Sequence, residues 1–371
     1  MSSIKTIGII GGGQLGKMLA MSAQQMGFRV ATLDPSADAP ARSVSHTFIQ
    51  APFSDKDALI ELCEQSDVIT YEFENIDGEI LNHLTAHYHI PQGAETVLTL
   101  QNRTAEKAAI KQSGATVVPY ESVQSIRDIE SFAKTHDFPV IVKTDSGGYD
   151  GKGQYFIDSQ DALQAADIPF QDADFIVEKY IDLKAEVSLT VGRNTKGQTV
   201  FFPLQENLHI DQILYRTTVP SRFNFQEQAS IEAEKIMAAL HFVGVFTIEF
   251  FIDQNDNLYV NEIAPRPHNS AHHSIESCNY SQFDIHIRAV LGKKLPEIEL
   301  RKPALMMNLL GKDLTNIGEN LYNQDNWHVH VYGKTENKPE RKMGHVTVLT
   351  QDISRSLHEL RPFFKAATDN Y

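Results

Sequence analysis

A run of glycines near the N-terminus constrains the first part of the fold. Residues 4–10 are an apolar stretch typical of a buried parallel strand, and residues 11–16 follow with the spacing Gly-x-Gly-x-x-Gly. An apolar helix is expected over residues 17–26 and a second strand over 28–33, which is followed by Asp34. This order predicts a βαβ unit whose loop and helix N-terminus favour an anion. The same glycines would also suit a tight turn, so the motif alone identifies no nucleotide.

A second glycine-rich loop lies between two strands. Lys143 ends an apolar strand, residues 145–153 contain four glycines and a lysine, and a strand resumes at Tyr155. A Walker loop runs instead from strand to helix and needs Gly-Lys-Ser/Thr, so this loop is not one. A glycine flap between antiparallel strands can cover a triphosphate with its N–H groups, while Lys143 supplies a cation. The loop therefore predicts nucleotide binding, with a plain hairpin as the alternative.

The segment from 245 to 262 has the alternating pattern of a β-hairpin. Side chains alternate between the two faces of a strand, so Glu249 lies on the face opposite its apolar neighbours. Pairing about the turn residues Asn255 and Asp256 places Glu249 opposite Glu262, with Cβ atoms about 5 Å apart. The apolar face is expected to consist of Phe246, Ile248, Phe250 and Ile252.

Two carboxylates at that separation repel each other unless a cation or a proton lies between them. Magnesium fits, because it takes few protein carboxylates and keeps substrate phosphate oxygens as ligands. Asn261 would add a neutral oxygen if the strand kinks there. The alternative is a solvated face with an ion pair at the sheet edge.

Composition limits the partners and the compartment. The 371 residues carry a formal net charge of −15, which argues against a general nucleic-acid binder. Cys63 and Cys278 form no disulfide framework or metal-type pair, as expected for a reducing cytosol. No stretch approaches the roughly 20 apolar residues of a membrane helix, so we expect a cytoplasmic protein without membrane partners.

Six motifs in order resemble those of the ATP-grasp superfamily and, within it, the N5-carboxyaminoimidazole ribonucleotide synthetases of purine biosynthesis. Each motif is modest alone, but together they extend from residue 7 to residue 347. They are Gly11-Gly-Gly-Gln-Leu-Gly-Lys-Met, Glu72-Phe-Glu-Asn, Lys143-Thr-x-x-Gly-Gly-Tyr-Asp-Gly-Lys-Gly-Gln, Pro203-Leu-x-Glu-Asn-x-His209, Asn261-Glu-x-Ala-Pro-Arg-Pro-His-Asn-Ser and Met307-Asn-Leu-Leu-Gly.

The resemblance implies a fold class of α/β followed by α+β, in four units. These are a Rossmann-like pre-ATP-grasp domain over 1–102, a small lid subdomain with a linker helix over 103–185, a larger antiparallel-sheet subdomain over 186–296 and a short β-rich C-terminal unit over 297–371. It also implies a homodimer.

The resemblance further implies ATP-driven carboxylation of 5-aminoimidazole ribonucleotide. Bicarbonate would attack the γ-phosphate of ATP to give carboxyphosphate and ADP, and the exocyclic amine would then capture the carboxyl group. Phosphoryl transfer needs positioning and charge neutralisation, which Lys143, the flap and a metal would supply. The expected metal is Mg²⁺, with Mn²⁺ as a substitute.

The matching positions give candidate residues for each role. Nucleotide contacts are expected from Arg103, Lys143, Gly148, Tyr149, Asp150, Gly151, Lys152, Gly153, Gln154, Glu178, Lys179, Tyr180, Ile181, Glu186, His209, Asn261 and Glu262. Glu249 and Glu262 would hold the metal. The ribonucleotide would contact Gln14, Leu15, Glu72, Asn75 and Tyr149, with its phosphate on Lys334, Arg341 and Lys342. Catalytic roles are expected for Lys143, Tyr149, Asp150, Arg266 and His268.

The segment after His268 departs from the family pattern. Ala271-His272-His273-Ser274 stands where Gly-His-Trp-Thr is usual, so a structural role for these histidines competes with a catalytic one. His268 and His272 are four residues apart, but the Glu of a His-Glu-x-x-His zinc motif is absent.

Three other functions fit parts of the sequence. Another ATP-grasp ligase, of the formate-dependent glycinamide ribonucleotide transformylase or biotin carboxylase type, would use the same flap and metal site. A nicotinamide-dependent oxidoreductase would use the first glycine loop, and a nucleotide-binding regulator would have no need of both Glu249 and Glu262.

Overall fold

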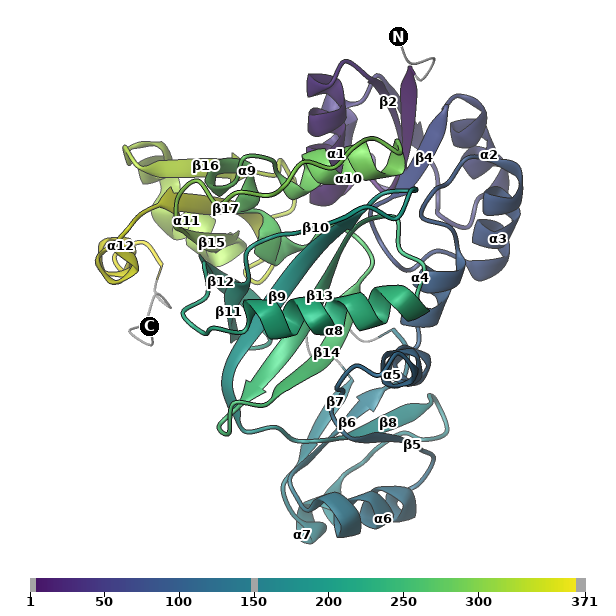
Figure 1. Ribbon diagram of the computed structural model, residues 1–371, viewed down its shortest axis with the longest axis vertical. Helices are drawn as coiled ribbons and strands as arrows, with labels where there is room; N and C mark the ends of the chain where they lie inside the picture. The colour runs from purple at the N-terminus through teal and green to yellow at the C-terminus, as the bar shows by residue number, and fades with distance from the viewer. Residues whose placement is uncertain (1–4, 148–152, 365–371) are drawn as a thin grey trace.

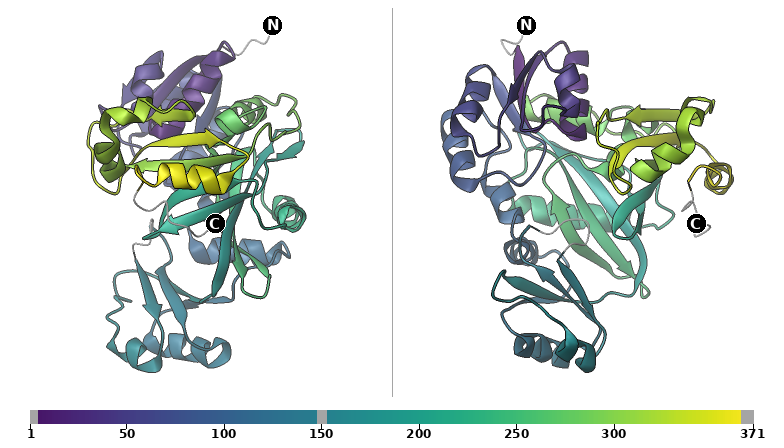
Figure 2. Two further views of the ribbon diagram at one scale, coloured as in Figure 1. Left: turned by 90° about the vertical axis from the view of Figure 1, so that its left-hand side faces the viewer. Right: turned by 180° about the vertical axis from the view of Figure 1, so that it is seen from behind.

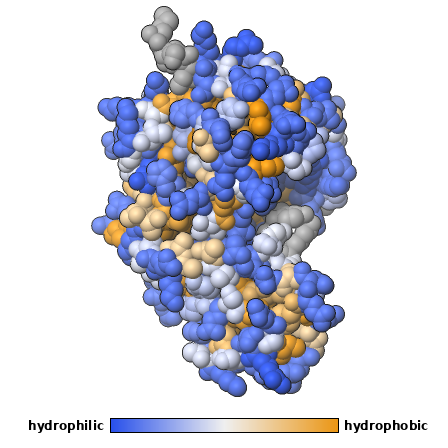
Figure 3. All heavy atoms as spheres, turned by 90° about the vertical axis from the view of Figure 1, so that its right-hand side faces the viewer, coloured by the Kyte–Doolittle hydropathy of each residue, from blue (hydrophilic) through white to orange (hydrophobic). Residues whose placement is uncertain are grey.

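The computed structural model describes residues 5–147 and 153–364. Figure 1 shows an N-terminal domain at the top, a lid at the bottom and a long twisted sheet between them, with the last strands at the left. Seen from the other sides, the lid remains a separate lobe at one end of the molecule (Figure 2). Figure 3 shows that one face of the molecule is mostly hydrophilic, with scattered apolar side chains over the body and the lid.

The N-terminal domain is a parallel sheet covered by helices, as the βαβ pattern predicts. Its four strands lie in the order β3-β2-β1-β4, and helix α1 follows the first glycine loop. The elements are β1 (Thr6–Ile10), α1 (Gln14–Gln25), β2 (Arg29–Asp34), η1 (Pro40–Val44), β3 (Thr47–Gln50), α2 (Lys56–Glu64), β4 (Val68–Tyr71), α3 (Gly78–His87) and α4 (Glu95–Leu100).

The lid is an antiparallel sheet in the order β5-β8-β6-β7, backed by α6 and α7. Side-chain caps fix its helices, since Ser125 accepts from the N–H of Asp128 at the start of α6 and Ser159 caps α7. Helix α5 leads into the lid and is capped by Asn102, whose side chain accepts from the N–H of Ala105. The elements are α5 (Arg103–Gln112), β5 (Tyr120–Val123), α6 (Ile126–His136), β6 (Val140–Thr144), β7 (Gln154–Ile157), α7 (Gln160–Ala165) and β8 (Phe175–Lys179).

The largest sheet has nine strands and extends into the C-terminal part of the chain. Its order is β14-β13-β9-β11-β12-β15-β17-β16. The remaining strand, β10, lies off this path and pairs with the C-terminal end of β9. The strands are β9 (Leu183–Arg193), β10 (Thr199–Phe201), β11 (Gln205–Ile210), β12 (Ile213–Val219), β13 (Gly244–Asp253), β14 (Leu258–Ala264), β15 (Ala304–Leu310), β16 (Trp327–Val331) and β17 (Lys342–Leu349). Because β12 pairs with β15, the C-terminal strands continue the sheet of the preceding residues.

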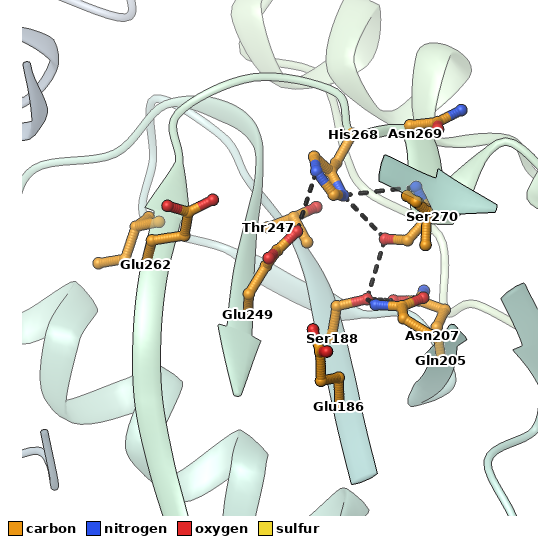
Figure 4. A network of polar contacts seen from close by, with 12 residues as sticks. Glu186, Ser188, Gln205, Asn207, Thr247, Glu249, Glu262, His268, Asn269 and Ser270 are labelled. Atoms are coloured by element: carbon orange, nitrogen blue, oxygen red, sulfur yellow. Dashed lines mark hydrogen bonds and ion pairs between the residues drawn. The ribbon is translucent and has the colours of Figure 1, made fainter. Parts of the chain in front are cut away.

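The two faces of this sheet differ in chemistry. The apolar face carries Phe246, Ile248, Phe250 and Ile252, as predicted, and packs against helix α8. The other face carries Glu249 and polar side chains of neighbouring strands, and the segment that starts at His268 crosses it (Figure 4). The helices of these regions are α8 (Gln226–Ala239), η2 (Asn269–Ala271), α9 (Ser274–Ser277), α10 (Gln282–Val290), α11 (Gly311–Ile317), η3 (Gly318–Tyr322) and α12 (Ile353–Leu360).

A buried histidine on α10 connects the N-terminal domain to the large sheet. His286 Nδ1 accepts from the N–H of Val245 at 3.1 Å, and Nε2 lies 2.7 Å from the hydroxyl of Thr70. Nδ1 can accept only while it carries no proton, so this arrangement holds the ring neutral. Burial lowers the pKa of His286 to about 3.

We expect His286 to make the protein sensitive to acid. Its pKa in the folded state is depressed below the ordinary value of 6.5, so its contribution to stability is complete above pH 6.5 and is lost as the pH falls toward 3. Over that range the loss is about 1.4 kcal/mol for each pH unit. His286→Gln keeps an acceptor and a donor but does not titrate, so the urea midpoint should fall less between pH 7 and pH 5 than in the unchanged protein. The exposed His328→Gln serves as the control, and equal slopes in all three proteins would contradict the assignment.

Among the helices of residues 5–147 and 153–364, none combines the length and apolar composition needed to cross a membrane.

Candidate active site

A cavity of about 910 Å³ lies where the lid, the large sheet, the N-terminal domain and the C-terminal strands meet. It brings together twenty of the predicted site residues. These are Gln14, Leu15, Asn75, Arg103, Lys143, Gln154, Glu178, Lys179, Tyr180, Ile181, Glu186, His209, Glu249, Asn261, Glu262, Arg266, His268, Lys334, Arg341 and Lys342. Glu72 and Gly153 are not in the cavity lining, and Gly148, Tyr149, Asp150, Gly151 and Lys152 lie outside the described residues.

Two lysines hold one carboxylate at the lid side of the cavity. Lys143 Nζ lies 2.9 Å from Glu178 Oε2, and Lys107 Nζ lies 3.3 Å from Glu178 Oε1. Burial disfavours the charged carboxylate, but the two lysines outweigh it and lower the pKa of Glu178 to about 2. Lys107 also donates to the backbone oxygen of Asn261 at 3.2 Å. Lys107 was not among the predicted site residues, because its position in a charged amphipathic helix resembles that of a solvated residue.

Asp145 fastens the start of the flap to helix α5. Its carboxylate accepts from the N–H of Thr104 at 2.8 Å and from the Thr104 hydroxyl at 2.7 Å, and it also accepts from the Asn102 amide. A carboxylate at a helix N-terminus is stabilised by the free N–H groups and the helix dipole. This contact fixes the end of α5 that carries Arg103, whose guanidinium lies 3.4 Å from Glu262.

Glu249 and Glu262 pair across the hairpin, as the sequence predicts. The register pairs Glu249 with Glu262 but Phe250 with Val260, so Asn261 is an extra residue in a β-bulge. Asn261 was predicted to add an oxygen to the metal site only if the strand kinks at this position, and the bulge is such a kink. Burial, followed by the nearby charge of Glu262, raises the pKa of Glu249 to about 7.

This carboxylate pair fits a magnesium ion that is completed by substrate oxygens. Burial and then Glu262 also raise the pKa of Glu106 to about 8, so excess negative potential surrounds the pair. Within residues 5–147 and 153–364, no group of three or more His, Cys, Asp and Glu is arranged to hold a metal ion. A metal at Glu249 and Glu262 would therefore need further oxygens, which nucleotide phosphates supply.

Glu186 and His209 come together on adjacent strands. His209 Nδ1 lies 2.8 Å from Glu186 Oε2. Burial opposes the charged imidazole, but the contact with Glu186 and the negative charges of Glu186 and Glu249 together outweigh it and raise the pKa of His209. A register shift between Leu208 and His209 in β11 re-aims the histidine into the cavity.

Arg266 forms an ion pair with the N-terminal domain. Its guanidinium makes a two-bond contact with Glu74, in which Nη2 lies 3.0 Å from Oε1 and Nε donates to Oε2. Glu74 lines the cavity but was not among the predicted site residues, although it lies inside the motif that starts at Glu72. The sequence could not identify which of the two glutamates would face the cavity.

Glu72 instead holds the first glycine loop. Its carboxylate accepts from the N–H groups of Gly13 at 2.6 Å and Gly16 at 3.0 Å, while Asp34 accepts from Gly12 at 2.8 Å. Burial raises the pKa of Glu72 to about 7 against the effect of these hydrogen bonds. The N–H groups expected to face an anionic ligand thus bind the protein's own carboxylates, as in the turn interpretation of the motif.

A cationic cluster from the C-terminal strands closes the other end of the cavity. Lys334 Nζ donates to the backbone oxygen of Lys342 at 2.8 Å, and Arg341 lies beside them. Burial, followed by repulsion from Arg341, lowers the pKa of Lys334 to about 8. A bound phosphate would relieve this repulsion.

The two histidines after His268 lie away from the cavity. His272 and His273 are fully buried and do not line the cavity. His272 Nδ1 bonds Gln282 at 2.9 Å, and His273 Nδ1 bonds Ser277 at 2.7 Å. Burial lowers the pKa of His273 to about 3, so its ring stays neutral in the folded protein. Of the three histidines at positions 268, 272 and 273, only His268 lines the cavity.

Family models match the chain in three successive parts. A ribonucleotide synthetase preATP-grasp domain matches residues 4–101, an ATP-grasp domain matches residues 108–283, and a phosphoribosylaminoimidazole carboxylase C-terminal domain matches residues 304–359.

Individual relatives match along almost the entire chain. The N5-carboxyaminoimidazole ribonucleotide synthase of Staphylococcus aureus (strain COL) is 53% identical over 364 residues, covering 98% of this chain and 97% of the relative. A crystal structure of the S. aureus enzyme complexed with ADP superposes with a TM-score of 0.95 at 52% identity, covering 98% of this chain and 99% of that one. An Aspergillus clavatus enzyme in complex with ADP and 5-aminoimidazole ribonucleotide gives a TM-score of 0.91 at 27% identity, covering 99% of each chain. With these matches along nearly its entire length, the chain belongs to the N5-carboxyaminoimidazole ribonucleotide synthase family of ATP-grasp ligases.

Proposed function

We propose that this protein joins the carboxyl group of bicarbonate to the exocyclic amine of 5-aminoimidazole ribonucleotide at the expense of ATP. The products are N5-carboxyaminoimidazole ribonucleotide, ADP and phosphate, in purine biosynthesis. One observation carries the proposal: a single cavity has a carboxylate pair in the middle, two lysines on Glu178 at the lid side and a cationic cluster at the opposite end. Such a cavity suits a magnesium nucleotide at one end and a second phosphate compound at the other.

The reaction divides into two transfers. An oxygen of bicarbonate bonds to the γ-phosphorus of ATP and ADP leaves, which gives carboxyphosphate. The amine nitrogen then bonds to the carboxyl carbon, phosphate leaves with the electrons of the broken C–O bond, and the amine loses a proton. Carboxyphosphate reacts readily with water, so a flap that closes over the cavity favours transfer over hydrolysis.

The nucleotide end of the cavity is assigned to the residues around Lys143. Lys143 would contact the phosphates, Glu178 to Ile181 the adenine and Glu186 the ribose. Glu178 would act mainly through the lysines that it holds. Magnesium on Glu249 and Glu262 would neutralise phosphate charge during the transfer.

The ribonucleotide end is assigned to the N-terminal domain and the cationic cluster. Gln14, Leu15 and Asn75 would contact the base and ribose, and Lys334, Arg341 and Lys342 would hold the 5′-phosphate. Arg266 and His268 lie between the two ends, where bicarbonate would react. Tyr149 and Asp150 of the flap are proposed to reach the same place. We further propose that the protein is a cytoplasmic homodimer. Each chain would consist of four units, with boundaries after residues 102, 185 and 296.

The proposal predicts that ADP release depends on the ribonucleotide. Purified protein would be incubated with MgATP and bicarbonate, with and without 5-aminoimidazole ribonucleotide, and ADP and the carboxylated product would be measured. We expect ribonucleotide to stimulate ADP release strongly and the product to form in a one-to-one ratio with ADP. ADP release of equal rate without the ribonucleotide, or with glycinamide ribonucleotide and formate in its place, would reject the proposed substrate.

A further inference from the structure

A row of buried polar side chains lies directly behind His268 (Figure 4). His268 follows β14, and its ring is located between Glu249 on one side and Ser270 on the other. Ser270 is fully buried and so is Ser188, the next member of the row on β9. None of the proposed substrates would touch these serines, since neither lines the cavity. The two serines are nevertheless hydrogen-bonded to each other, and Ser270 is hydrogen-bonded to Nδ1 of His268.

The hydrogen-bond directions at His268 define where its proton sits. The backbone N–H of Ser270 points at Nδ1 at 3.4 Å, and the Ser270 hydroxyl lies 2.9 Å from the same atom. A backbone N–H can only donate, so Nδ1 is an acceptor and the ring proton resides on Nε2. Nε2 lies 3.1 Å from Oε1 of Glu249, and it therefore donates to that carboxylate.

The neighbours of Ser270 keep its hydroxyl aimed at the histidine. Because Nδ1 of His268 carries no proton, the Ser270 hydroxyl can bond it only as the donor. The Ser188 hydroxyl lies 2.9 Å from the Ser270 oxygen and 3.1 Å from Oε1 of Gln205, and it can donate to either one. The Ser188 oxygen in turn accepts from the side-chain amide of Asn207 at 2.9 Å. Asn207 is itself fixed, because its oxygen accepts from the Thr217 hydroxyl at 3.0 Å. The row thus leads from Thr217 on β12 to Nδ1 of His268, with a branch from Ser188 to Gln205.

We propose that Ser270 is a positioning residue that fixes the Nε2–H tautomer and the ring orientation of His268. This rests on the proposed function in one respect, the use of Glu249 as a metal ligand. With the ring fixed, one oxygen of Glu249 is held by His268, which leaves the other oxygen for a metal shared with Glu262. A ring rotated by half a turn would place Cε1 where Nε2 faces the Glu249 oxygen, and a ring protonated on Nδ1 in place of Nε2 would present a lone pair to that oxygen. Either change would remove the hydrogen bond that holds Glu249.

The tautomer can be observed directly in the complete protein. The chain would be labelled with ¹⁵N-histidine, and the signals of His268 assigned by their loss in His268→Gln. In the unchanged protein we expect a protonated Nε2 and an Nδ1 with the shift of a hydrogen-bonded acceptor. Protonation on Nδ1 would overturn the proposal, and this result does not depend on whether the protein carboxylates the proposed substrate.

Substitutions test the role of Ser270. Ser270→Ala removes the hydroxyl, so the Nδ1 signal should move toward that of an unbonded nitrogen and kcat should fall about tenfold, with KM for ATP little changed. Ser188→Ala keeps the Ser270 hydroxyl but not its orientation, and it should shift the signal in the same direction by less. The matched control is Ser277→Ala, which removes an equivalent hydroxyl–Nδ1 bond from His273 outside the cavity.

Two patterns would contradict the positioning role. One is an unchanged Nδ1 signal of His268 in folded Ser270→Ala. The other is a loss of kcat in Ser277→Ala as large as in Ser270→Ala, since that would trace the effect to general packing of the segment. Thermal unfolding of each variant shows whether it is folded. If Ser270→Ala does not fold, the Nδ1 signal of His268 in Ser188→Ala provides the test.

Discussion

Replacing Glu262 by Gln is expected to reduce ATP turnover by about a thousandfold or more while leaving the fold intact. A bound metal contributes several kcal/mol to charge stabilisation in the transition state, and each 1.36 kcal/mol corresponds to a factor of ten. The melting temperature should stay the same or rise, because the change removes a charge that repels Glu249 and Glu106. Turnover and thermal unfolding are measured on the same preparation.

The control for this substitution is an exposed glutamate. Glu227→Gln, in the first turn of α8, should leave both quantities unchanged. Binding of Mn²⁺ in the presence of ADP, followed by electron paramagnetic resonance, should weaken in Glu262→Gln and not in Glu227→Gln. Normal turnover in Glu262→Gln would reject the metal assignment, whatever the metal titration gives.

Replacing Lys107 by Met should destabilise the protein by about 3 kcal/mol. Lys107 is 1% exposed and touches both Glu178 and the backbone of Asn261, so its loss leaves a buried carboxylate with Lys143 as its remaining lysine partner. ATP binding should also weaken, since Lys143 would be drawn further toward Glu178. The free energy of unfolding, measured with urea, gives the size of the effect.

Helix α5 offers a matched comparison for this change. Lys111 is exposed four residues further along the same helix, and Lys111→Met should stay within about 0.5 kcal/mol of the unchanged protein. Adding Glu178→Gln to Lys107→Met should recover part of the stability, because the unpaired charge is then removed. If Lys107→Met lowered the free energy of unfolding as little as Lys111→Met, the ion pair of Lys107 with Glu178 would make no net contribution to stability.

Local patterns predicted the parts of the site that lie within one hairpin or one cap. Alternation and turn chemistry were sufficient to place Glu249 opposite Glu262, and Asn102 caps α5 as its residue type suggests. Contacts between distant segments carried no such signal. The pairing of Arg266 with Glu74 joins two domains, and neither residue's neighbours in the sequence distinguish it from a solvated charge.

The hairpin of β11 and β12 shows why some elements escaped prediction. Its two turn residues, Asp211 and Gln212, both adopt positive φ, at 50° and 66°. Two-residue turns of this kind usually contain Asn-Gly or Asp-Gly, and this turn contains no glycine. The strand that carries His209 was therefore missed as an element, although His209 itself was found by resemblance.

The pairing of β12 with β15 has a consequence for how the chain is made. Residues that lie between the two strands supply α8, the carboxylate hairpin and α10, and all of them leave the ribosome before β15 does. Until then β12 presents an open edge with unpaired N–H and C=O groups, which is a template for association with other chains. Synthesis of β15 thus ends a period of exposure for the central sheet, and conditions that slow translation before it should favour aggregation over folding.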